Sequence, residues 1–132
     1  MMKNEPRMSD EKEGAKPAKP RFDLEERTAR FGEAVIALAK SVSANVVTSP
    51  ILSQLVRAAT SVGANYCEAN DSESKKDFRH KIATCRKESH ETKHWLRMLA
   101  AADHGMREKA VPLWREAKEL NLIFSSIFRG AK

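Results

Sequence analysis

Apolar side chains recur at alternating spacings of four and three residues in four separate stretches of the chain. The first stretch aligns Leu24, Phe31, Val35, Leu38 and Val42, with Thr28 completing the register. Such spacings place side chains on one face of an α-helix, whereas a half-buried strand alternates every second residue. Each stretch therefore predicts an amphipathic helix with one apolar stripe, which favours helices packed against one another.

Three further stretches repeat the pattern. The second stripe is Leu52, Leu55, Ala59, Val62 and Tyr66; the third is Phe78, Ile82, Cys85, Ser89, Thr92, Leu96 and Leu99; the fourth is Leu113, Ala117, Leu120, Phe124 and Ile127. Ser49 before Pro50, and Ser74 three residues before Asp77, are typical of helix N-termini. We expect helices over about 24–44, 50–69, 74–103 and from 107 onward.

The connection between the second and third predicted helices, residues 70–73, is too short for anything but an antiparallel return. A chain of 132 residues is long enough for one domain and too short to expect two. The sequence therefore predicts an all-α fold, an antiparallel up-down-up-down four-helix bundle over residues 22–132.

Residues 1–21 have a different character from the rest of the chain. They hold three prolines, six basic and four acidic side chains, and no apolar side chain larger than alanine except methionine. Such a segment buries too little surface to offset its ordering entropy, so we expect a disordered N-terminal tail. A tail of mixed charge either acts only as a solubilising extension or contacts nucleic acid.

No apolar run approaches the roughly 20 residues that span a bilayer, and the N-terminus lacks the apolar stretch of a secretory signal. We therefore expect a cytoplasmic protein that is not embedded in a membrane. Cys67 and Cys85 fall within helical patterns, as reduced and buried thiols do. An antiparallel pairing displaces them by roughly 9 Å along the helix axis, more than the Cα separation of about 7 Å that a disulfide tolerates.

Several large apolar residues lie outside the predicted stripes. They are Trp95 and Met98 in the third helix, and Trp114, Leu122, Ile123 and Phe128 in the fourth. A single bundle is not expected to bury all of them, so the sequence predicts self-association.

Polar residues form a second pattern across the middle helices. In an antiparallel pair Arg57 lies next to Glu88, and Glu68 lies beside Arg79. Two interpretations are open: a solvated flank with ordinary ion pairs, or a partly buried network that fixes helix register or a subunit contact. The residues of this candidate network are Arg57, Ser61, Asn65, Glu68, Glu88 and Glu91.

The same helices carry motifs that resemble a known family. The second helix contains QLVRAATSVGANYCEA at 54–69, and the third contains SKKDF at 74–78 and KESHETKHWL at 87–96. These stretches resemble motifs of the bacterial four-helix-bundle proteins encoded within intervening sequences of 23S ribosomal RNA genes. The matching positions are Arg57, Ser61, Asn65, Glu68, Asp77, Phe78, Glu88, Glu91, Thr92, Trp95 and Leu96. His94 and Cys67 depart from the family pattern, in which the position of His94 more often holds an aromatic such as tyrosine.

The resemblance implies a homo-oligomer, typically a pentameric barrel of bundles. It also links the chain to the accessory proteins of diversity-generating retroelements, which bind a reverse transcriptase and nucleic acid through basic surfaces. The family supplies an expectation of fold and assembly more firmly than one of activity.

The string His90, Glu91, Thr92, Lys93, His94 matches the H-E-x-x-H pattern of zinc proteases. No third ligand is evident, and Lys93 places a cation beside the would-be metal. By resemblance Glu91 belongs to the family pattern, whereas both histidines lie at variable positions. The sequence offers neither a nucleophile paired with a base nor a phosphate-binding glycine loop. We therefore predict a protein that is not an enzyme and holds no metal or cofactor.

Positive charge concentrates in the third helix. Residues 75–97 hold eight basic and three acidic side chains, most of the chain's net charge of +6. Such a run is either a solvated face or a phosphate-binding surface. The favoured hypothesis is a non-enzymatic homo-oligomeric module that binds RNA or DNA; the alternative is a protein-interaction scaffold with no nucleic-acid role. The candidate contact residues are Lys75, Lys76, Arg79, Arg86, Lys87 and Lys93.

Overall fold

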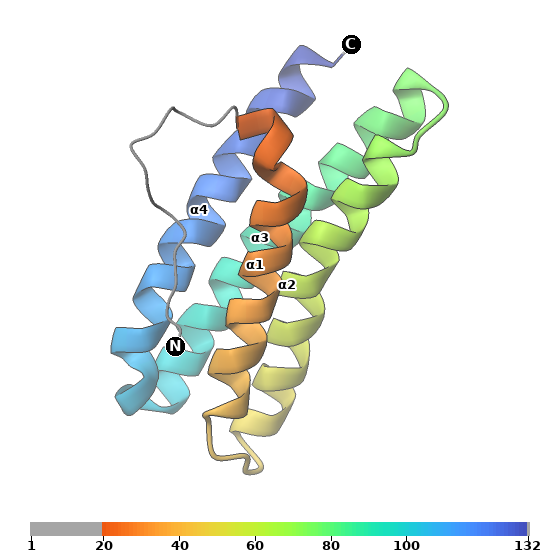
Figure 1. The fold of residues 1–132 in the computed structure, drawn as a ribbon. Helices are drawn as coiled ribbons and strands as arrows, with labels where there is room; N and C mark the ends of the chain where they lie inside the picture. The colour runs from red at the N-terminus through yellow and green to blue at the C-terminus, as the bar shows by residue number, and fades with distance from the viewer. Residues whose placement is uncertain (1–19, 132) are drawn as a thin grey trace.

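The computed structural model describes the backbone of residues 20–131 and the side chains of residues 24–131. It contains four α-helices and one short 3₁₀-helix: α1 (Pro20–Lys40), α2 (Thr48–Asn70), α3 (Lys75–Ala102), η1 (His104–Met106) and α4 (Arg107–Gly130). The predicted all-α, four-helix fold is confirmed. Figure 1 shows each helix running back along the one before it. Residues 1–19 of the predicted tail lie outside the described residues.

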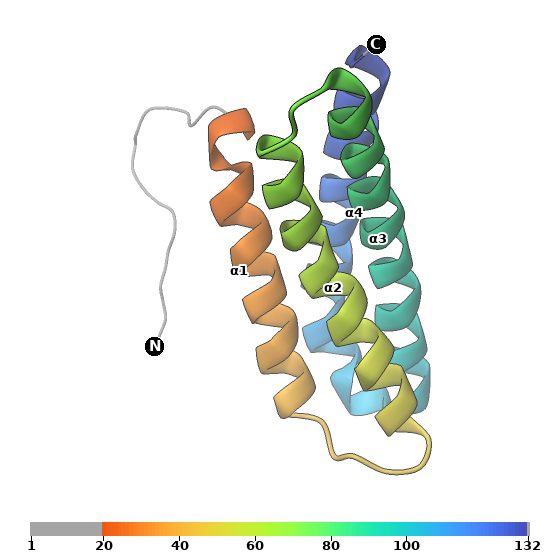
Figure 2. The same cartoon turned by 90° about the vertical axis from the view of Figure 1, so that its right-hand side faces the viewer.

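The helices do not pack equally. α3 makes its extensive contacts with α2 on one side and α4 on the other, whereas α1 packs mainly on α2 and touches α4 much less. Figure 2 shows α1 at one side of the molecule and α3 with α4 at the other. None of the described helices combines the length and apolar character needed to cross a membrane.

Most of the core comes from the predicted stripes, with Ala58, Ala69 and Ala110 added to them. Leu52, Phe78, Leu113 and Ile127 of the stripes are only partly buried. The largest fully buried apolar side chains of the core are Phe124, Leu24, Leu55, Ile82, Leu96, Leu99 and Leu120. Thr28 and Thr92 of the stripes are also buried, because the hydroxyl of each can donate to a carbonyl of its own helix. Thr28 Oγ1 donates to Leu24 O and Thr92 Oγ1 donates to Glu88 O, each at 2.7 Å.

The start of α2 differs from the prediction. Ser49 does not cap the helix, which begins at Thr48 without a capping side chain at the preceding Val47. Asn45 supplies the acceptor instead, since its Oδ1 accepts hydrogen bonds from the backbone N–H groups of Val47 at 2.8 Å and Thr48 at 2.9 Å. The predicted N-cap of α3 is confirmed, because Ser74 Oγ accepts from the Asp77 N–H at 3.0 Å.

Candidate nucleic-acid interface

Three of the predicted contact residues lie on the side of α3 that faces α4. Arg79, Arg86 and Lys93 follow at intervals of seven residues, which aligns them along a helix. Arg79 Cζ lies 3.8 Å from the centroid of the Phe128 ring and Arg86 Cζ lies 4.3 Å from it. Both guanidinium groups therefore rest on one aromatic side chain of α4.

A second cluster follows further along the same surface. Lys93 Nζ of α3 lies 5.1 Å from the centroid of the Trp114 ring, and Lys118 Nζ of α4 lies 5.8 Å from it. We call the surface formed by Arg79, Arg86, Lys93, Lys118, Phe128 and Trp114 the basic-aromatic strip. Both rings are partly buried against the core, so they hold the cations at the molecular surface.

The strip is chemically suited to anions. No ion pair joins Arg79, Arg86 or Lys93 to a carboxylate within residues 24–131. A guanidinium stacked on a ring keeps its in-plane N–H donors available, and these donors match phosphate oxygens. The strip can therefore offer several cations to a linear polyanion.

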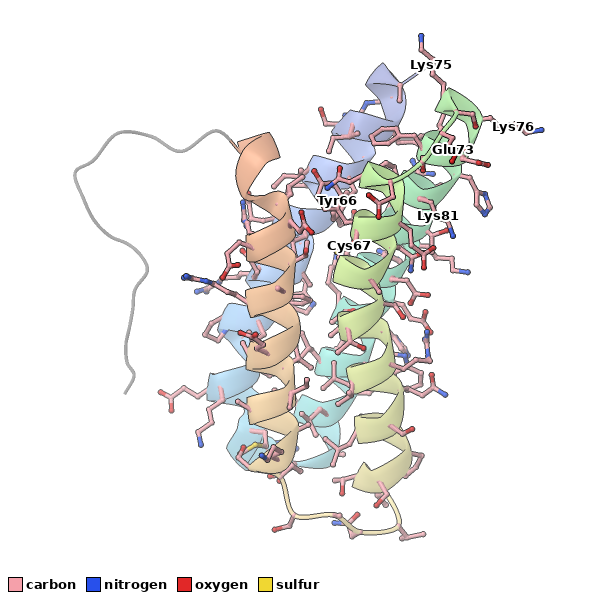
Figure 3. All side chains as sticks on the ribbon, turned by 45° about the vertical axis from the view of Figure 1, so that its right-hand side comes forward. Tyr66, Cys67, Glu73, Lys75, Lys76 and Lys81 are labelled. Atoms are coloured by element: carbon pink, nitrogen blue, oxygen red, sulfur yellow. The ribbon has the colours of Figure 1, made fainter. Side chains whose placement is uncertain are left out.

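Lys75, Lys76 and Lys87, the other predicted contact residues, are all exposed. Lys75 lies eighteen residues, or five helical turns, before Lys93 and so continues the line of Arg79, Arg86 and Lys93, whereas Lys76 and Lys87 lie on another side of α3. Figure 3 shows Lys75 and Lys76 pointing away from the bundle at the α2–α3 turn. The eleven-residue interval from Lys76 to Lys87 is about three helical turns, which places Lys87 on the same side of α3 as Lys76. The six predicted residues thus share one helix but not one face.

Sequence reasoning missed the α4 part of the strip. Phe128 and Trp114 stand out in the sequence as apolar residues beside the stripe of α4, and we assigned them to self-association. Asn121 joins the two clusters, since its Nδ2 donates to the carbonyl of Arg86 at 2.8 Å and lies 3.4 Å from Ser89 Oγ. Only the packing of α4 on α3 shows that the arginines cover the Phe128 ring.

Part of the candidate polar network is close together. Arg57 Nη1 lies 3.3 Å from Glu88 Oε1, and Arg57 Nη2 lies 2.9 Å from Glu91 Oε2. Trp95 Nε1 lies 3.4 Å from the same Glu91 oxygen. Partial burial would raise the pKa of the Glu91 carboxyl, but the hydrogen bonds from Arg57 and Trp95 outweigh it and hold that pKa below its usual range.

The remaining members of that set lie apart from this cluster. Asn65 Nδ2 donates to the Ser61 carbonyl at 2.9 Å, one turn back on α2. Glu68 pairs with Lys81 near the α2–α3 turn, rather than lying beside Arg79. The structure thus divides the six residues into a cluster of Arg57, Glu88 and Glu91, a local bond within α2, and a separate ion pair.

The H-E-x-x-H string is split between two sides of α3. Glu91 turns toward Arg57, whereas His90 and His94 are exposed and His94 lies edge-on to Trp95 with ring centroids 5.0 Å apart. Over residues 24–131 no group of three or more His, Cys, Asp or Glu side chains is placed to hold a metal ion.

Both cysteines are free, in agreement with the predicted lack of an internal bridge. The prediction that both are buried is wrong for Cys67, which is exposed on α2 with Sγ 3.5 Å from Glu25 Oε2. Cys85 is buried, and burial raises the pKa of its thiol to about 12. The prediction failed because Cys67 lies one position beyond Tyr66, the last residue of the predicted stripe, and so points to another side of α2.

Comparison with known proteins relates most of the chain to one family. The model of the 23S rRNA-intervening sequence protein family matches residues 22–126. Among solved structures, a protein of unknown function from the S23 ribosomal protein family of Bacteroides thetaiotaomicron is 28% identical, with a TM-score of 0.69 over 80% of this chain and 97% of that chain. A search of curated proteins found no match.

Proposed function

Because the chain belongs to the 23S rRNA-intervening sequence protein family, we propose that it is a non-enzymatic, self-associating cytoplasmic module that binds RNA or DNA through the basic surface of α3. Neither that family nor the similar Bacteroides protein is described as an enzyme. The observation that carries the proposal is the basic-aromatic strip, in which cations that have no carboxylate partner among residues 24–131 are held on aromatic rings.

The strip favours an extended polyanion over a small anion. Arg79 and Lys93 are fourteen residues apart on α3, which is about 21 Å at 1.5 Å per residue. A nucleic-acid backbone presents phosphates over that length, and each basic contact releases condensed counterions and so adds to affinity. Lys75, Lys76 and Lys87 extend the positive surface beyond the strip.

The test compares two double variants with the same loss of charge. Arg79→Gln/Arg86→Gln removes two cations from the strip, and Arg30→Gln/Lys40→Gln removes two exposed cations from α1. Binding of a fluorescent single-stranded oligonucleotide is measured by anisotropy over a salt series. The parent should show a steep decrease of affinity with salt, and the strip variant should flatten the log–log slope by about 1.4, or about 0.7 for each lost contact. The α1 variant should keep the parent slope.

The possible outcomes separate the two candidate functions. Equal slopes for both variants would mean that net charge alone drives binding and that the strip is not the site. No binding by the parent at low salt would instead favour the protein-interaction scaffold.

Self-association is supported by apolar surface that one bundle leaves accessible. Trp95 and Ile123 are only partly buried, and Leu122 is 54% exposed. We expect light scattering to give a mass several times 14.8 kDa, with five copies as the number that the family resemblance implies. A mass of one chain at micromolar concentration would refute this part of the proposal.

A further inference from the structure

One end of the α3–α4 surface contains a groove with a positive rim. It has a volume of about 740 Å³ and lies where the end of α3 meets η1 and the start of α4. Arg97, Arg107 and Arg115 line it, together with the apolar side chains of Val111 and Trp114. No acidic residue in the described part of the chain lines this groove, which we call the cationic groove.

A second groove of similar size has the opposite charge. It lies between α1 and α2 and has a volume of about 710 Å³. Glu25, Glu26 and Glu33 line it beside Ile36, whose side chain is 39% exposed. No lysine or arginine among residues 24–131 lines this second groove, which we call the acidic groove. Arg30 lies beside it and pairs with Glu26 at 2.9 Å, which leaves two of the three carboxylates in excess.

The two grooves lie on opposite sides of the bundle. α2 packs between α1 and α3, and α3 packs between α2 and α4, so the α1–α2 edge is opposite the α3–α4 edge. Figure 2 shows this separation of α1 from the α3–α4 pair. A single neighbouring molecule therefore cannot cover both grooves of one copy.

We propose that the acidic groove of one copy docks on the cationic groove of the next copy, so that each molecule contacts two neighbours through different surfaces. Three carboxylates then face three guanidinium groups, and Ile36 meets the apolar floor formed with Val111 and Trp114. Such a head-to-tail contact closes into a ring or continues as a filament, whereas a two-fold contact would oppose like charges. This inference rests on the self-association part of the proposed function.

Charge reversal followed by restoration tests this pairing. Arg107→Glu/Arg115→Glu makes the cationic groove repulsive, and Glu26→Lys/Glu33→Lys does the same to the acidic groove; all four side chains are exposed. Each double variant should fall to 14.8 kDa in light scattering, with unchanged helical circular dichroism. The variant with all four substitutions should regain the parent mass, because its grooves are again complementary. The control Lys40→Glu/Arg129→Glu reverses two exposed charges that line neither groove and should assemble as the parent does.

Cys67 provides a second readout, because it lines the acidic groove and is exposed in the single chain. At one fixed pH, iodoacetamide should alkylate it several-fold more slowly in the assembled parent than in Arg107→Glu/Arg115→Glu. A monomeric parent would refute self-association and this inference together. If the parent assembles, and neither charge-reversal variant changes its mass or the reactivity of Cys67, only the groove pairing would be refuted. Loss of nucleic-acid binding in Arg107→Glu/Arg115→Glu at unchanged mass would overturn it by assigning the cationic groove to nucleic acid.

Discussion

At the scale of single residues, Arg57 has two carboxylates to neutralise across the α2–α3 contact. The Glu88 side chain is only 10% exposed, whereas that of Arg57 is 45% exposed. A carboxylate held at this depth needs hydrogen-bond donors, because burial removes most of its water. Arg57 supplies donors to Glu88 while bonding Glu91, so its removal affects both groups.

We therefore expect Arg57→Met to destabilise the fold at pH 7 by about 1–3 kcal/mol, measured by urea unfolding. The control Arg30→Met breaks the Arg30–Glu26 pair, whose two side chains are exposed on α1, and should cost less than about 0.5 kcal/mol. The folded-state pKa of Glu91 is depressed, so its stabilising contribution is present above the unfolded pKa of about 4.3 and is lost as pH falls through the folded pKa. The difference between parent and Arg57→Met should accordingly shrink below about pH 4, and a constant difference down to pH 2 would contradict the ion-pair explanation.

The same cluster bears on the H-E-x-x-H string. Glu91 is committed to Arg57 and Trp95, and His90 is exposed on the outer side of α3. Purified protein should contain no stoichiometric zinc by atomic absorption, and His90→Ala should change the free energy of unfolding by less than about 0.5 kcal/mol. Equimolar metal that disappears on this substitution would overturn the prediction.

At the scale of the helices, the connection between α1 and α2 offers a test of how α2 begins. Asn45 Oδ1 caps two backbone N–H groups, whereas Ser49, the N-cap that the sequence suggests, lies inside the helix. Asn45→Ala should lower the free energy of unfolding by about 1 kcal/mol in denaturant titrations. Ser49→Ala should stay within about 0.5 kcal/mol of the parent. The reverse order of the two effects would mean that the helix starts as the sequence suggests.

This difference shows what the sequence can and cannot predict. The spacing of Leu24, Phe31 and Val35 predicts their burial directly, because helix periodicity and burial share one cause. The start of α2 was missed because both Ser49 and Asn45 suit a local capping rule, and Ser49 before Pro50 is the more familiar pattern. Asn45 accepts from the N–H groups two and three residues on, as an Asx turn does. The prediction that Cys67 is buried was wrong because Cys67 lies one position beyond the buried Tyr66 on α2.

Contacts between helices were predictable only where a short connection fixes the register. The α2–α3 turn placed Arg57 next to Glu88 correctly, and the two side chains lie 3.3 Å apart. The same arithmetic placed Glu68 beside Arg79, yet Glu68 pairs with Lys81. The contact of Arg86 with Phe128 joins residues 42 positions apart in the chain, and it depends on how α4 packs against α3.

At the scale of the whole molecule, the two proposals together make affinity depend on assembly. If copies join head to tail, the contact covers Trp114 at one end of the basic-aromatic strip, while Arg79 and Arg86 on Phe128 stay available in each copy. One long strand can then contact several copies at once. A linked second contact benefits from a high effective concentration, so avidity should exceed the affinity of one subunit. A strand too short to reach a second strip should gain nothing from assembly.

We expect a 60-nucleotide single strand to bind the parent at least about tenfold more tightly than a 10-nucleotide strand, compared at equal nucleotide concentration by anisotropy. Glu26→Lys/Glu33→Lys should abolish that advantage if it prevents assembly. This variant is the informative one, because it removes no basic residue and adds two, so charge alone would strengthen the binding of phosphate. A parent that binds both strands equally per nucleotide would show that its copies act independently. A length advantage that survives in the monomeric variant would mean that one bundle holds the whole nucleic-acid site, with its reach extended from the strip toward Lys75 and Lys76 at the α2–α3 turn (Figure 3).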